Sequence, residues 1–213
     1  MLSLNGGAVI GQGTLTVATN IFAQSGSVAA SLGGAANLIK TTSGTLTLSG
    51  ANTTTGTNQI SAGKLFVNGS HTGAGSYTVA SNAVLGGTGT VSLASGAVTL
   101  QPGSTLAPGA APGAGGRLTL SALTLGAAAT LAVDARGDLV AVTGDAALSD
   151  NPVTVADFGA FDPSARYPLL TYGGSVTGTL KLSGDAGKWV LRHDAPSKTF
   201  YLANSRGTVL FLL

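Results

Sequence analysis

Residues 38–70, LIKTTSGTLTLSGANTTTGTNQISAGKLFVNGS, contain the pattern that decides the fold. In this stretch, GTLTL from Gly44 and GKLFV from Gly63 each place two apolar residues two positions apart after a glycine. Such alternation is typical of a short strand with one buried face. Copies of the pattern open at Gly13, Gly44, Gly63, Gly75, Gly89, Gly96, Gly116, Gly178 and Gly207. The sequence therefore predicts many short strands with glycine at their corners.

The spacing between these copies is uneven, and this argues for one architecture over others. It is 19 residues from Gly44 to Gly63 but only 7 from Gly89 to Gly96. A barrel or a sandwich favours more even strands and hairpins, whereas a solenoid tolerates loops of unequal size. We therefore predict an all-β protein, a parallel β-helix with little helix. At roughly 20–25 residues a coil, it has about eight to ten coils.

The alternation also assigns the faces of the strands. Apolar positions should point into a column that successive coils bury together, and the residues between them should point outward. The expected core rows contain Leu46, Leu48, Leu65, Val67, Val91 and Leu93. Thr45, Thr47 and Lys64 are expected on the outside.

The chain changes character along its length. Residues 1–116 contain Lys40 and Lys64 but no acid, and every aspartate lies further on. We predict a repeat region over 1–130 and, continuous with it, C-terminal coils and a cap over 131–213. Within the second part, residues 189–194, 195–198 and 199–204 predict a strand, a turn and a strand. This antiparallel hairpin is expected to cover the end of the column, because exposed coil ends invite edge pairing.

Composition excludes several classes of protein. Charged residues make up 8% of the chain, against roughly 25% in ordinary soluble domains. The net charge of +2 comes from scattered basic residues, which is unlike a nucleic-acid-binding surface. No cysteine is present to form a disulfide or a thiolate metal site. No apolar run approaches the ~18 residues of a membrane helix, so we expect that the chain does not span a membrane.

Residues 38–70 closely resemble the autotransporter-associated β-strand repeat, also called the passenger-associated transport repeat. The matching features are Lys40-Thr, the run from Gly44 to Asn52, the Thr55-Gly56 turn and the run from Ala62 to Leu65. Residues 84–91, 104–109 and 137–144 are similar to segments that follow this repeat.

The resemblance implies a right-handed β-helical passenger that is secreted and displayed on a bacterial cell surface. In the parent protein it would be anchored at the outer membrane. Residues 1–20 lack the basic and apolar regions of a secretory signal. If it is exported, we therefore expect the chain to be a segment of something longer.

Catalytic motifs are weak throughout. No serine nucleophile elbow and no phosphate loop are present, and the absence of glutamate excludes the zinc-protease motif. The candidate cluster is Asp134, Arg136, Asp138 and Asp145, in which two carboxylates could act as acid and base on a polysaccharide. The alternative interpretation, which we favour, is that Asp138, Asp145 and Asp150 cap turns. We predict no catalytic residue, no cofactor and no metal site.

Two further features have a functional and a structural interpretation. Arg136-Gly137-Asp138 spells a tripeptide that resembles integrin-binding adhesins, although a glycine-rich chain produces it easily by chance. His71 follows Asn68-Gly-Ser and is interpreted as a solvated turn residue, and His193 as part of the hairpin strand.

Three functions remain open from the sequence. The favoured one is a non-catalytic, structural or adhesive surface module, whose partners would be another copy, a host or matrix surface, or glycans. The second is a polysaccharide-degrading β-helix enzyme, and the third is a fibre or spike segment. Fold alone does not choose among them.

Overall fold

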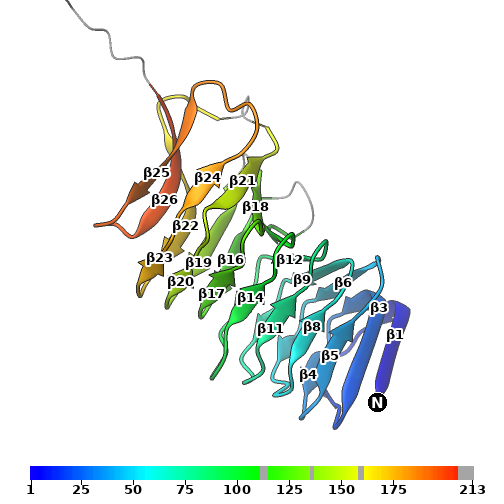
Figure 1. Ribbon diagram of the computed structural model, residues 1–213. Coiled ribbons are helices and arrows are strands. Elements are labelled where there is room, and N and C mark those ends of the chain that lie inside the picture. The colour runs from blue at the N-terminus through cyan, green and yellow to red at the C-terminus, as the bar shows by residue number, and fades with distance from the viewer. Residues whose placement is uncertain (111–114, 135–136, 158–160, 206–213) are drawn as a thin grey trace, which may run out of the picture.

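The computed structural model describes residues 1–110, 115–134, 137–157 and 161–205. These residues form a parallel β-solenoid of about seven turns, and no helix occurs among them. Figure 1 shows the coils stacked side by side from the N-terminus to a hairpin at the other end. The predicted all-β, parallel, stacked architecture is confirmed.

Each complete coil contributes strands to three faces. The first face contains β5 (Asn37–Lys40), β8 (Asn58–Ile60), β11 (Tyr77–Val79), β14 (Val98–Leu100), β17 (Leu123–Leu125), β20 (Ala146–Ala147) and β23 (Val176–Thr177). The second contains β6 (Thr45–Leu48), β9 (Lys64–Val67), β12 (Val84–Gly87), β15 (Thr105–Pro108), β18 (Thr130–Val133), β21 (Asn151–Val155) and β24 (Leu180–Leu182). The third contains β7 (Ala51–Asn52), β10 (Ser70–His71), β13 (Thr90–Val91), β16 (Arg117–Leu120), β19 (Leu139–Val142) and β22 (Arg166–Tyr172).

The N-terminal coils are less regular. The long strand β3 (Asn20–Val28) pairs with both β5 and β6, and so joins the first two faces into one sheet. On its other side it pairs with β1 (Leu2–Val9), and β2 (Thr14–Thr16) pairs with β4 (Ser31–Gly33). The eight glycine-led copies from Gly13 to Gly178 all open strands. The copy at Gly207 lies outside the described residues.

Rows of aliphatic side chains fill the column. On the second face, the row runs in register through Leu46, Leu65, Leu85, Leu106, Leu131 and Val153, all of them fully buried. All six residues predicted for the core are buried, and the most exposed of them is Leu93 at 8%. Thr45 is exposed, while Thr47 and Lys64 are half-buried on the outer surface. The predicted assignment of faces is confirmed.

The number of coils is smaller than the eight to ten expected, because the coils lengthen along the chain. Leu65 is in register with Leu85, twenty residues later. Leu106 is in register with Leu131, twenty-five residues later, and Val153 with Leu182, twenty-nine residues later. Loops after the second face absorb the extra length, and the final described residues form a hairpin instead of another coil.

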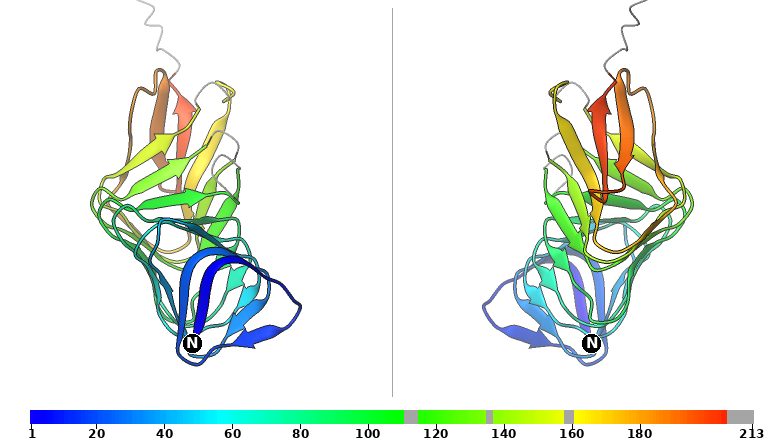
Figure 2. Two further views of the ribbon diagram at one scale, coloured as in Figure 1. Left: turned by 90° about the vertical axis from the view of Figure 1, so that its right-hand side faces the viewer. Right: turned by 90° about the vertical axis from the view of Figure 1, so that its left-hand side faces the viewer.

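The hairpin consists of β25 (Trp189–Asp194) and β26 (Thr199–Asn204), which are antiparallel. β26 also pairs antiparallel with β22, so the hairpin extends the third face at the C-terminal end of the stack. Trp189, Phe200 and Leu202 are buried in the continuous core. Figure 2 shows this hairpin at the end opposite the N-terminus. The predicted strand, turn and strand agree with the structure, and the hairpin lies at the C-terminal end of the stack.

Candidate functional site

Asp134 and Asp138 lie together at the corner between β18 and β19. The Asp138 side chain is only 4% exposed, and its two carboxylate oxygens accept hydrogen bonds from the backbone N–H groups of Gly116 and Asp134, each at 2.8 Å. The Gly116 bond ties this corner to the preceding coil. Burial raises the pKa of Asp138 to about 6, and the nearby charge of Asp134 contributes to this rise.

The remaining members of the sequence-derived cluster do not join this pair. Arg136 lies outside the described residues. Asp145 lies at a different corner, between β19 and β20, where its Oδ1 accepts hydrogen bonds from the backbone N–H (2.7 Å) and the hydroxyl (2.8 Å) of Ser175. These bonds hold the pKa of Asp145 below its usual range. The turn-capping interpretation therefore describes Asp138 and Asp145 well, whereas Asp150 forms an exposed ion pair with Lys181.

A shallow hollow of about 300 Å³ runs along the outer surface of the second face and ends at the Asp134–Asp138 corner. Its lining includes Phe66, Ala107, Ala132 and Thr154. Phe66 lies across its partner in register, Gly86, where an added Cβ would approach the ring to 2.8 Å. The hollow is therefore mostly apolar, and its only described carboxyl groups are those at one end.

Asp138 meets one requirement of acid–base catalysis, but it also has a structural role in its corner. Asp138 is poised to titrate near neutral pH, as a general acid requires. Both of its oxygens, however, are already occupied by backbone N–H groups. The burial of Asp138 also argues against the adhesin tripeptide interpretation, which needs an exposed carboxylate.

Sequence reasoning missed a buried polar cluster around His71. The interpretation of His71 as a solvated turn residue is wrong, because its side chain is 1% exposed inside the column. Its Nδ1 lies 2.5 Å from the Tyr77 hydroxyl, and its Nε2 lies 2.9 Å from the carbonyl oxygen of Thr54. A carbonyl only accepts, so Nε2 carries the proton and Nδ1 accepts from Tyr77. Burial lowers the pKa of His71, which favours the neutral ring, although the Thr54 bond opposes this effect.

A periodic signal could have found His71. In register, it lies between Asn52 of the preceding coil and Val91 of the next. Both neighbours are buried, so position 71 belongs to an inward row of the third face. Sequence reasoning also missed the burial of Lys40. This side chain is fully buried and donates hydrogen bonds to the carbonyls of Thr42 and Ala62. Burial lowers the pKa of Lys40.

Asparagine side chains hold neighbouring coils together at several corners. The side-chain oxygens of Asn37, Asn52 and Asn68 accept hydrogen bonds from the backbone N–H groups of Thr57, Leu32 and Thr88, each twenty residues away. Asp138 makes the same kind of contact one coil back, to Gly116. This shared geometry places Asp138 among the structural corner residues.

No protein-family model matches the chain, and no curated protein is similar to it. The repeated coils and their corner contacts define the class as a β-solenoid repeat protein. Among the described residues, no helix is long and apolar enough to cross a membrane. In the same residues, no three His, Asp or Glu side chains lie close enough together to hold a metal ion.

Titration of Asp138 should change the stability of the fold. Its folded pKa of about 6 lies above its usual value of 3.8, so the folded chain binds this proton more tightly than the unfolded chain. As the pH falls from 7 to 4, wild type should gain up to about 3 kcal/mol in unfolding free energy relative to Asp138→Asn. Urea unfolding of both proteins across this range measures the difference, in which the contributions of His71 and Asp145 cancel. A difference that stays constant with pH would contradict the assignment.

Proposed function

We propose that this chain is a non-catalytic β-helical passenger module with a structural and adhesive role on a bacterial cell surface. The resemblance of residues 38–70 to the passenger-associated repeat supports this setting, and the stacked parallel coils fit a passenger or a fibre-like module. The observation that supports a non-catalytic role is the hydrogen bonding of the Asp138 carboxyl group. Its two oxygens accept hydrogen bonds from the backbone N–H groups of Gly116 and Asp134, and the bond from Gly116 links two neighbouring coils.

The nature of the surface also supports display. Residues 1–116 contain two lysines and no acid, and one of these lysines, Lys40, is fully buried. Threonine and asparagine occupy many outward and corner positions of these coils. Such a surface offers hydroxyl and amide groups at regular intervals of about 4.8 Å along the stack. It suits a rigid spacer, self-association or contact with glycans.

The hollow beside Asp134 and Asp138 favours a second candidate function, polysaccharide degradation. Purified wild type should therefore be incubated with polygalacturonate, alginate and dextran while reducing ends are measured. We expect no turnover of any of them, and Asp134→Ala and Asp138→Ala should behave like wild type. Turnover by wild type that either variant abolishes would replace the display role with an enzymatic one.

A further inference from the structure

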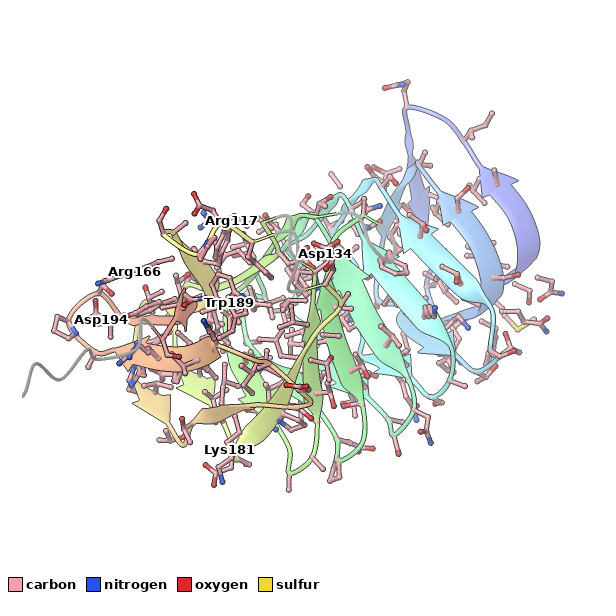
Figure 3. All side chains as sticks on the ribbon, turned by 90° about the horizontal axis from the view of Figure 1, so that it is seen from above. Arg117, Asp134, Arg166, Lys181, Trp189 and Asp194 are labelled. Atoms are coloured by element: carbon pink, nitrogen blue, oxygen red, sulfur yellow. The ribbon has the colours of Figure 1, made fainter. Side chains whose placement is uncertain are left out.

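The outer face of the C-terminal cap gathers two arginines around one tyrosine. Arg192 of β25 lies directly opposite Tyr201 of β26 in the antiparallel register. Arg166 of β22 pairs with Ala203, and its guanidinium carbon lies 5.2 Å from the centre of the Tyr201 ring. Because side chains alternate along a strand, these residues point away from the column, opposite to Phe200 and Leu202. In Figure 3, Arg166 lies at the outer margin of the cap, whereas Trp189 lies among packed side chains.

These side chains line an open hollow of about 370 Å³. Ser164, Arg166, Arg192, Tyr201 and Asn204 contribute to it, and polar groups make up most of its surface. It differs in this respect from the apolar hollow beside Asp138. Both arginines are exposed, and the tyrosine and asparagine are half-buried.

Among the described residues, neither guanidinium forms an ion pair with a carboxylate. The ion pair found in this part of the chain joins Lys181 and Asp150. Asp162 accepts hydrogen bonds from Ser164, and Asp194 accepts one from the Ser197 hydroxyl at 2.7 Å. Lys198 donates to the carbonyls of Gly173 and Gly174. The cap thus presents two positive charges on a pre-arranged surface.

We infer that this cap face binds the carboxylate groups of an acidic polysaccharide. Guanidinium groups present a planar fork of donors that matches a carboxylate in two parallel hydrogen bonds. Stacking on Tyr201 holds the Arg166 side chain in place, which reduces the entropy lost on binding. The Ser164 and Tyr201 hydroxyls and the Asn204 amide supply partners for sugar hydroxyls. The hollow lacks a deep apolar pocket for a peptide side chain, which favours a saccharide over an acidic peptide.

The inference names a ligand for the displayed module and rests on the proposed display role for its biological setting. The two fail separately, because turnover tests the display role and equilibrium binding tests this site. Binding of the full chain to polygalacturonate should be measured by calorimetry at low salt, with dextran as the neutral probe and poly-L-glutamate as the acidic peptide.

We expect binding to polygalacturonate but not to dextran, and weaker binding to poly-L-glutamate. Arg166→Gln and Arg192→Gln should each weaken the affinity roughly tenfold or more, since each removes a charge-assisted contact. Arg192→Lys should restore only part of it, because the fork is lost while the charge is kept. Lys181→Gln is the matched control: it removes one exposed positive charge elsewhere and should change the affinity less than about twofold.

Three results would overturn the inference. One is an equal loss of affinity in Lys181→Gln and the arginine variants, which would reveal attraction to net charge alone. Another is unchanged affinity in both arginine variants when circular dichroism shows that they are folded. The third is binding to poly-L-glutamate that equals or exceeds binding to polygalacturonate, which would assign the face to an acidic peptide.

Discussion

Leu46→Asp is expected to abolish folding or to lower the unfolding free energy by about 4 kcal/mol or more. Leu46 is fully buried on β6, in register with Gly26 on one side and Leu65 on the other. An aspartate at this position would place an unpaired carboxylate inside the apolar column. Because each coil rests on its neighbours, the damage should extend beyond β6 to the stacked rows on both sides.

Thr47→Asp is the matched control, since the same side chain is introduced one position along the same strand. Thr47 points to the outer surface and is half-buried, so a new carboxylate there stays in contact with water. We expect a change of about 1 kcal/mol or less. Leu46→Ala should remain folded enough for urea unfolding to be measured, at a cost of about 2–5 kcal/mol. Equal effects of the two aspartates would contradict the assignment of Leu46 to the column and Thr47 to the outer surface.

The sequence predicts the repeated strands well because their burial is periodic. Alternation places Leu46 and Leu48 inward without any knowledge of loop lengths, and the hairpin at 189–204 is predicted from two local strands and a turn. The number of coils depends on loop lengths, however, and the loops lengthen after β15. A uniform period therefore overestimates the count.

Polar residues inside the column show where residue type misleads. His71 and Lys40 belong to inward positions by register, but their chemistry argues for solvent. Each is tolerated because backbone carbonyls at the corners accept its protons. Phe66 is the opposite case: it points outward but is buried, because its ring lies against Gly86. Alternation thus predicts the direction of a side chain better than it predicts exposure.

The candidate sites depend on contacts between coils that sequence spacing does not give. Asp138 and Asp145 are only seven residues apart, yet β19 carries the chain along one face between them to a different corner. Conversely, Arg166 and Tyr201 are distant in sequence and meet because β22 pairs with β26. The sequence therefore suggested an acidic cluster that the fold divides, and it gave no sign of the basic face on the cap.

Removal of the cap hairpin is expected to have the second large effect. A chain ending at residue 185 would lose Trp189, Phe200 and Leu202, which are 9%, 1% and 0% exposed in the complete fold. It would also leave β22 without its antiparallel partner β26, so the edge of the third face would move from the hairpin strand β25 to β22. Burial of one large apolar side chain contributes about 1.5–3 kcal/mol. The three losses together should lower the melting temperature by about 10 °C or more.

Loss of the hairpin should also cause self-association, because it would expose apolar core residues beside the newly unpaired edge of β22. Thermal melting and light scattering of the chain ending at 185 should therefore be compared with a chain ending at 205, which keeps β25 and β26 whole. We expect the longer chain to match the full chain in melting temperature and light scattering, and the shorter chain to aggregate on heating. Trp189→Ala in the full chain tests packing while β26 stays paired with β22, so it should lower the melting temperature without promoting association. If the chain ending at 185 melted and scattered light like the full chain, the core would be closed by coils other than this hairpin.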